Sequence, residues 1–145
     1  MKLSRTVSYA VRATLQLAQS GSSVPIPCSK LAAEGQMPER FLLQILRMLV
    51  THGILRSTRG VDGGYSLVRP VDEISLLEII EAIDGRLDSP RSDQAREDEV
   101  QAKLQLALTQ VADITRRQLQ AVKLSQLLEP PQKATMAETA AIAVS

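Results

Sequence analysis

Apolar residues in the first third of the chain recur with the period of an α-helix. Residues 4–19 carry them every three or four positions, and the small residues and prolines that follow end this predicted helix. A short helix is expected from 27 to Gly35, and a second begins at Pro38, where the missing amide hydrogen costs nothing, and ends at Gly53. Two helices joined by a tight turn predict a helix-turn-helix. The pattern places these residues in the core: Leu31, Ala32, Phe41, Leu42, Ile45, Leu46 and Leu49.

The period changes to two directly after the second of these helices. Residues 53–60 and 65–70 alternate apolar and polar side chains, as β-strands do, and the VDGG between them is typical of a turn because glycine tolerates positive φ. A β-hairpin that follows a helix-turn-helix is a winged helix. Its tip carries Arg59, whose guanidinium can enter a narrow, electronegative groove. A plain hairpin with solvated arginines would give the same pattern.

The helical period returns after the hairpin. Ser75 and Glu78 form an S-x-x-E capping box ahead of a helix that ends at Gly85. Residues 86–99 are polar and charged, which is typical of a linker or a frayed helix start. We expect four apolar residues to pack on the wing and the first helix: Ile74, Leu77, Ile80 and Ile83.

A long helix with one apolar stripe is predicted next. A polar rod with one apolar face needs a partner, and the simplest partner is a second copy of the chain in a two-fold dimer. The alternative is that the helix folds back on its own domain. KLSQLLE predicts a short last helix, and the tail after it begins with two prolines. The stripe consists of Val100, Leu104, Leu108, Val111, Ile114 (or Thr115), Leu119 and Val122.

These elements predict a mainly α fold with a small β-wing. A winged helix-turn-helix domain is expected at 1–85, a linker with a long dimerisation helix at 86–129, and a disordered tail at 130–145. With aromatic residues at 2%, the core must be aliphatic.

Composition and charge narrow the possible functions. The 145 residues include one cysteine and no long apolar run, so we expect no internal disulfide, signal peptide or membrane span, and a cytoplasmic location. Residues 1–70 hold nine Lys/Arg and three Asp/Glu, a balance of +6, whereas residues 71–145 hold eight and thirteen, a balance of −5. A basic half suggests a module that binds a polyanion. The same charge asymmetry would arise if two helical segments were merely solvated by unequal numbers of acidic and basic side chains.

Three segments carry a family resemblance: MKLSRTVSYAV, the run from PERFLLQ to GGYSLVRP, and ISLLEIIEAIDG. Over about residues 1–86 the chain closely resembles the Rrf-two family of bacterial winged-helix transcription regulators, which includes the iron–sulfur assembly regulator and the nitric-oxide sensor. RGVDGGY, in the wing, is the most specific match. The resemblance implies a homodimer on a near-palindromic operator in double-stranded DNA, with the long helices crossing at the two-fold axis.

The resemblance also implies which residues contact DNA. The second helix of the helix-turn-helix would read the major groove through Arg40 and Gln44, because arginine can fork onto guanine and glutamine can pair with adenine. The wing arginine that family members place in the minor groove matches Arg59, beside Gly60. Phosphate contacts are expected from Lys2, Arg5 and Tyr9 by the resemblance, and from Arg47 and Arg56 by charge and position alone.

The chain departs from the family pattern at two places. Leu43 stands where many members carry a glutamate, and it offers a base only apolar contact, for example to a thymine methyl, so operator preference should differ. Cluster-binding members hold three cysteines before the long helix, whereas residues 86–103 contain neither cysteine nor histidine. Because Fe–S clusters need thiolate or, in special cases, nitrogen ligands, we expect no cluster and no other cofactor.

The remaining chemistry-bearing residues have simple structural explanations. Cys28 lies near a predicted helix N-terminus, where the dipole would lower its pKa and make it a candidate redox thiol, but a small residue filling a gap between helices is the favoured interpretation. His52, the only histidine, suits a helix C-terminus and has no second metal ligand nearby in sequence. Arg12 and Arg69 could be solvated charge. No catalytic motif is present, so we expect no enzyme activity.

Two functions of different classes remain. The first is a homodimeric, cluster-free DNA-binding transcription regulator, most simply a repressor, under the control of an effector small molecule or a partner enzyme. The second is a winged-helix adaptor that docks a metabolic enzyme and has no affinity for DNA.

Overall fold

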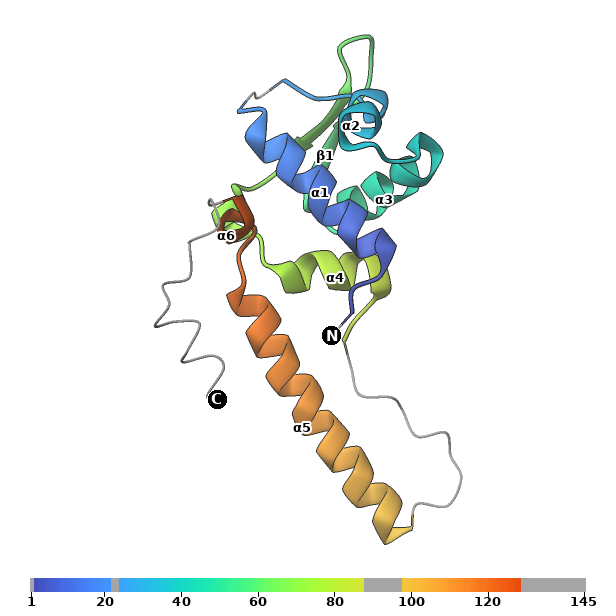
Figure 1. The fold of residues 1–145 in the computed structure, drawn as a ribbon, viewed down its shortest axis with the longest axis vertical. Helices are drawn as coiled ribbons and strands as arrows, with labels where there is room; N and C mark the ends of the chain where they lie inside the picture. Colours follow the sequence, from blue (N-terminus) through green and yellow to red (C-terminus); the bar gives the residue numbers. More distant parts are fainter. Residues whose placement is uncertain (1, 22–23, 88–97, 129–145) are drawn as a thin grey trace, which may run out of the picture.

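A helical domain and one long projecting helix make up the computed structural model, which describes residues 2–21, 24–87 and 98–128 (Figure 1). α1 (Arg5–Gln19), α2 (Cys28–Gly35) and α3 (Glu39–Thr51) pack on one another, and α4 (Leu76–Asp84) packs against α1 and α3. Aliphatic side chains fill the space between them, as the scarcity of aromatics requires. The core includes Val7, Ala10, Leu17, Leu31, Leu42, Ile45, Leu46, Leu49, Ile54, Ile74 and Ile79.

The turn between α2 and α3 is held from outside by α1. Gly35 is the last residue of α2, and Gln36 rather than a glycine takes the left-handed conformation, at φ 53°. Arg12 donates to the carbonyl oxygen of Gly35 at 3.2 Å, and Gln16 donates to that of Leu31 at 3.3 Å. The Gly35 carbonyl is one that the end of α2 leaves without an intrahelical partner, and Arg12 satisfies it. Arg12 is therefore a structural residue and not only solvated charge.

The wing is a hairpin of β1 (Leu55–Thr58) and β2 (Gly64–Leu67), in which Leu55 lies opposite Leu67. Its second strand is paired on both sides, because Ile26 and Tyr65 exchange two backbone hydrogen bonds of 2.9 and 2.8 Å. The segment before α2 therefore anchors the base of the wing to the helix-turn-helix.

Gly64 lies where this anchoring segment crosses the wing, and alanine should be tolerated poorly there. Its φ of 152° is strained for other residues, and a Cβ would overlap the backbone of Ile26. We expect Gly64→Ala to lower the free energy of unfolding by about 2–3 kcal/mol in urea denaturation. Gly60→Ala is the matched control, since φ there is 115° but a Cβ meets open space. Equal losses in both variants would show that the crossing is not close-packed.

α4 begins with the predicted capping box. Ser75 Oγ accepts from the Glu78 amide at 3.2 Å, and the Ser75 amide donates to Glu78 Oε2 at 2.8 Å. Arg69, at the end of the wing, donates to Glu78 Oε1 at 2.6 Å and to the carbonyl of Glu73, in the 3₁₀ turn η1 (Val71–Glu73), at 3.1 Å. Arg69 is thus the link between the wing and α4, which the expectation of solvated charge missed.

The same contacts make stability depend on pH through Glu78. Burial raises the pKa of its carboxyl, but hydrogen bonds from the Ser75 amide and the Arg69 guanidinium outweigh burial, and the net pKa lies below its ordinary value. A carboxyl with a lowered pKa stabilises the fold above its ordinary pKa and loses that contribution as the pH falls through the folded pKa.

Glu78→Gln should therefore destabilise the protein most at neutral pH. We expect a loss of about 1 kcal/mol there, which is typical of a helix cap, since a solvated ion pair adds little. The difference from the wild type should shrink in acid, as measured by urea unfolding across the pH range. Glu73→Gln is the control, because Glu73 takes part in the Arg69 contact only through its backbone. A constant difference at every pH would contradict the role of the ionised carboxylate.

α5 (Glu99–Ala121) touches the domain only near its C-terminal end. Arg116 on α5 pairs with Glu81 on α4 at 2.7 Å, and Leu119 packs against the core. Past α5, the Val122 carbonyl accepts from the Leu76 amide and the Leu124 amide donates to the Ile74 carbonyl, both at the start of α4, and α6 (Leu124–Leu128) follows. The predicted long helix and short last helix are thus confirmed. The fold-back alternative holds only for the end of α5.

Two predicted segments fall outside the described residues: most of the linker, at 88–97, and the tail, at 130–145. Among the described residues, no helix combines the length and hydrophobicity that a membrane crossing requires.

Candidate nucleic-acid interface

The outer face of α3 presents three of the side chains predicted to contact DNA. Leu42, Ile45 and Leu49 are buried on the inner face, and the helical period then directs Arg40, Gln44 and Arg47 to solvent, where all three are exposed. Leu43, between the two faces, is half-buried. α3 therefore offers two cations and an amide along one exposed stripe, with one apolar side chain beside them.

Phe41 does not lie in the core, contrary to the sequence prediction. It is 39% exposed, and its ring meets Tyr9 of α1 edge to face, with centroids 6.0 Å apart and an interplanar angle of 80°. The helical period points Phe41 to the boundary of the buried face, and the ring of Tyr9 gives it a partner there. This contact sets the first turns of α1 beside the start of α3.

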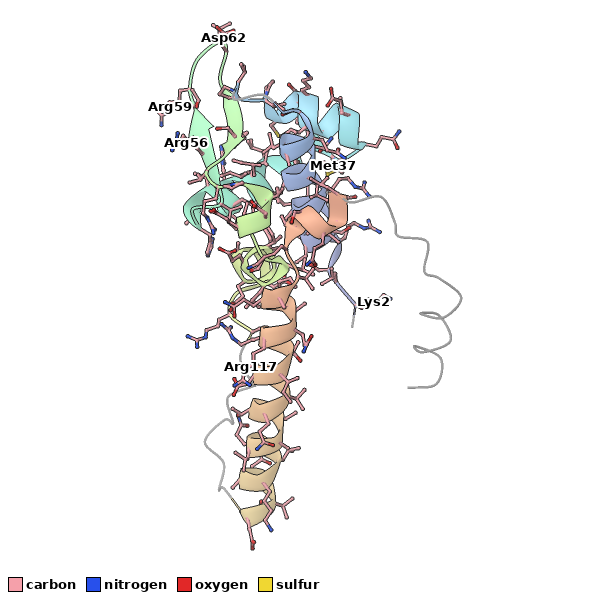
Figure 2. The ribbon with its side chains drawn as sticks, turned by 90° about the vertical axis from the view of Figure 1, so that its left-hand side faces the viewer. Lys2, Met37, Arg56, Arg59, Asp62 and Arg117 are labelled. Carbon is pink, nitrogen blue, oxygen red and sulfur yellow. The ribbon has the colours of Figure 1, made fainter. Side chains whose placement is uncertain are left out.

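Lys2 and Arg5, which the sequence analysis predicts to contact phosphate, lie near the start of α1. Arg5 is the first residue of α1, and both Lys2 and Arg5 are exposed. Figure 2 shows Lys2 on the opposite side of the domain from the wing arginines. The sequence-predicted cations thus lie at three places: the N-terminal end of α1, the outer face of α3 and the wing.

The wing carries exposed arginines on a tightly fixed backbone. Arg56 and Arg59 project from the same edge of the hairpin, and Asp62 lies at its tip (Figure 2). Gly60 has a φ of 115° with open space around it, whereas a Cβ on Gly63 would overlap the carbonyl oxygen of Thr58. The turn therefore has open space at Gly60 and is close-packed at Gly63. Asp62 places a negative charge at the tip, which the sequence analysis did not weigh.

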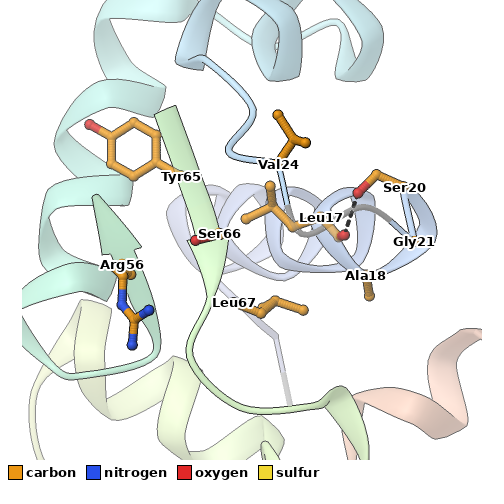
Figure 3. Close-up of a pocket in the computed structure, with 9 residues that line it drawn as sticks. All are labelled: Leu17, Ala18, Ser20, Gly21, Val24, Arg56, Tyr65, Ser66 and Leu67. Carbon is orange, nitrogen blue, oxygen red and sulfur yellow. Dashed lines mark hydrogen bonds between the residues drawn. The ribbon is translucent and has the colours of Figure 1, made fainter. Parts of the chain in front are cut away.

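A hollow of about 390 Å³ lies between the wing and the end of α1 (Figure 3). Arg56, Tyr65 and Ser66 line it from the wing, and Leu17 and Ser20 line it from α1. Burial raises the pKa of the Tyr65 phenol, the nearby Cys28 raises it further, and Arg47 opposes both with a smaller effect. The phenol therefore stays protonated and can donate a hydrogen bond. Tyr65 was missed by sequence reasoning because only the fold brings it near Arg47.

Comparison with known proteins identifies the family of this winged helix. A model of the Rrf2 family, described as iron-dependent transcriptional regulator, matches residues 3–130. The chain belongs to the Rrf2 family. The resemblance inferred from the sequence is thereby confirmed, as is the winged-helix fold. The description also agrees with the expectation that the chain is not an enzyme.

Individual relatives agree with the Rrf2 assignment. A Mycobacterium tuberculosis protein that bears the name "Putative HTH-type transcriptional regulator Rv1287" is 44% identical over 91 residues, which are 63% of this chain and 56% of that protein. The HTH-type transcriptional regulator IscR of Cronobacter sakazakii is 32% identical over the same share of each chain. The structure of CymR, the global cysteine regulator of B. subtilis, superposes with a TM-score of 0.69 at 28% identity, covering 88% of this chain and 95% of that one. The chain thus spans about 56% of the length of the curated relatives that it matches.

The Rrf2 description names iron, but the side chains present do not fit an Fe–S cluster. The chain holds one cysteine and one histidine, Cys28 and His52, and neither lies between 86 and 103. His52 Nδ1 lies 2.9 Å from the carbonyl oxygen of Met48, in its own helix. Within the described ranges, no group of three or more His, Cys, Asp or Glu side chains could hold a metal ion. A single thiol cannot supply the ligands that clusters require.

Cys28 is less acidic than the sequence analysis expected. Its thiol is half-buried and donates to the carbonyl oxygen of Glu39 at 3.7 Å. Burial raises its pKa, and the negative charge of Glu39 raises it further, so the expected lowering by the helix dipole was wrong in direction. The thiol therefore stays protonated near neutral pH, which favours the gap-filling interpretation over a reactive thiolate.

Proposed function

We propose that this Rrf2 protein is a sequence-specific DNA-binding transcription regulator that acts as a homodimer without an Fe–S cluster. The observation that carries the proposal is the exposed stripe of Arg40, Gln44 and Arg47 on α3, in one domain with the wing arginines Arg56 and Arg59. Arginine and glutamine match the donor and acceptor patterns of guanine and adenine in the major groove. The relatives named as transcriptional regulators support the same function, although they are longer than the matched region.

The wing and the N-terminal segment have separate roles in this proposal. Arg59 enters the minor groove, where a narrow A/T-rich stretch concentrates negative potential, and the exposed Gly60 lets the turn approach the groove closely. Phosphates are contacted by Lys2, Arg5, Tyr9, Arg47 and Arg56. Such contacts position the domain on the duplex and carry no sequence information, so they should weaken with salt.

The simplest regulatory action is repression, since a dimer on an operator excludes other proteins from the same DNA. Because the chain lacks the ligands for a cluster, we propose that an effector small molecule or a partner enzyme regulates its binding to DNA.

Selection of bound fragments from a genomic library by the purified chain tests the proposal. Enriched fragments should share a near-palindromic motif whose half-sites are one helical turn apart. Replacing Lys2 or Arg5 with alanine should then weaken binding to all sequences alike and reduce the slope of affinity against salt by about one unit for each lost contact. No enrichment at low ionic strength would reject the proposal.

The adaptor function keeps one observation in its favour. Most of α5 projects from the domain with exposed apolar residues, and such a face would also suit an enzyme partner. Recovery of a stoichiometric enzyme in a pull-down, together with no affinity for any duplex, would favour it.

A further inference from the structure

The start of α3 borders a hollow that the proposed base readers do not account for. It measures about 460 Å³ and is lined by Cys28, Glu39, Arg40 and Leu43. Two of these side chains, Cys28 and Leu43, are half-buried and apolar, whereas Glu39 and Arg40 are charged and exposed. The hollow therefore suits a flat group with one apolar edge and polar atoms next to that edge.

Cys28 behaves as an apolar wall of this hollow. Its Sγ faces the carbonyl oxygen of Glu39 at 3.7 Å, so its single weak donor is directed to the backbone. Burial and the charge of Glu39 raise the pKa of the thiol, which keeps it neutral. A protonated, half-buried cysteine packs like a small hydrophobic residue.

A base edge with the matching pattern exists in the major groove. Thymine presents its C5-methyl there beside the O4 acceptor, whereas cytosine presents a hydrogen at C5 beside an N4 donor, and purines carry no methyl. Arg40, at the rim, can donate to O4 while the methyl meets the apolar wall. The hollow is much larger than a methyl group, so it would take the edge of the base and not the methyl alone.

We propose that Cys28 and Leu43 together bind the C5-methyl edge of a thymine in each operator half-site. This inference rests on the proposed function, because it requires that α3 enter the major groove. It gives Cys28, on the first helix of the helix-turn-helix, a part in choosing the operator sequence.

Replacement of single thymines by deoxyuridine tests the inference, because uracil lacks only the methyl. The probe is the operator duplex selected by the purified protein, with one thymine changed at a time. Each half-site should contain one thymine whose replacement lowers the affinity about fourfold, as expected for the loss of one buried methyl group. Replacing that thymine in both half-sites should lower the affinity about 15-fold. Titration by fluorescence anisotropy measures the ratio of affinities for the thymine and uracil duplexes.

Protein variants test whether the preference for thymine over uracil depends on the residues that line the hollow. Leu43→Ala and Cys28→Ser should each bring the ratio of thymine to uracil affinities toward one at the sensitive position. Cys28→Ser changes the polarity of the side chain and hardly its size. If Leu43→Ala does not fold, Cys28→Ser still tests the role of the hollow. Arg59→Ala, on the wing, should lower affinity for both duplexes and leave their ratio unchanged.

Three results would overturn the inference. The first is that uracil lowers the affinity at no position. The second is that uracil lowers it at one position, but Leu43→Ala and Cys28→Ser both leave the ratio of thymine to uracil affinities unchanged there. The third is a gain in affinity from 5-methylcytosine with no loss from uracil, which would assign the hollow to a methylated cytosine. If the protein binds no duplex at all, the proposed function is wrong, and the role of the hollow in thymine recognition is wrong with it.

Discussion

Replacing Arg59 with alanine should lower the affinity of the dimer for its operator by about 100-fold or more. A charge-assisted hydrogen bond contributes about 1.5–3 kcal/mol, and a two-fold dimer loses the contact twice. The side chain is exposed on the wing, so its removal opens no cavity in the core. The loss should therefore appear in DNA binding and not in thermal stability.

A mobility shift with the selected operator measures this effect, and Arg117→Ala is the matched control. Arg117 is also an exposed arginine, on α5 and far from the wing (Figure 2). Its removal changes the net charge by the same amount, so any general electrostatic loss should be common to both variants. Gln44→Ala should differ from both by weakening discrimination between operator sequences. Full operator affinity in Arg59→Ala would reject the assignment of the wing to the minor groove.

The local elements of the fold were predictable because their signals are local. The S-x-x-E box at Ser75 starts α4, and the two short alternating runs form the hairpin around the glycines. Helical periodicity also placed Leu42, Ile45 and Leu49 on the buried face of α3, and the structure exposes Arg40 and Gln44, which the resemblance assigned to DNA. Each of these features depends on residues within a few positions of one another.

Features that depend on contacts between distant segments were missed. Phe41 lies at the edge of the core because Tyr9, from another helix, covers it. Arg12 and Arg69 appeared to be plain surface charge, yet each bonds an acceptor brought close by the fold. The pairing of Ile26 with the wing has no sequence signal, because a single isolated bridge has no periodicity.

The candidate interface likewise has features that the sequence predicts and features that depend on contacts between distant segments. Its cations were found from the family resemblance, from charge and position, and, for Arg59, also from turn chemistry, and none of these requires a contact between distant segments. The hollow beside them could not be found in this way, because Cys28 comes from α2 and Leu43 from α3. The raised pKa of Cys28 likewise depends on Glu39, which lies eleven residues away in sequence.

Lysine at both Leu104 and Val111 should convert the protein to a monomer. These residues lie one heptad apart on the stripe of α5 and are 50% and 60% exposed, and no residue of α5 is buried in the described chain. A 23-residue helix spans about 34 Å, too much apolar surface to leave in water along one face. A second α5 would cover the stripe, and two lysines from each copy would then face each other in an apolar seam.

Loss of the dimer should abolish tight operator binding. A monomer reaches one half-site, and the gain from tethering the second, typically about 100-fold or more, disappears. Sedimentation equilibrium should report the monomer, and the mobility shift should report the loss of affinity.

Leu106→Lys is the matched control for the helix face. Leu106 is 61% exposed, but it lies on the side of α5 opposite the stripe, so its replacement should leave a dimer with full affinity. If the Leu104 and Val111 double variant remains dimeric, α5 is not the two-fold interface. If it becomes monomeric but keeps wild-type affinity, one winged helix suffices for recognition, and the near-palindromic operator is wrong.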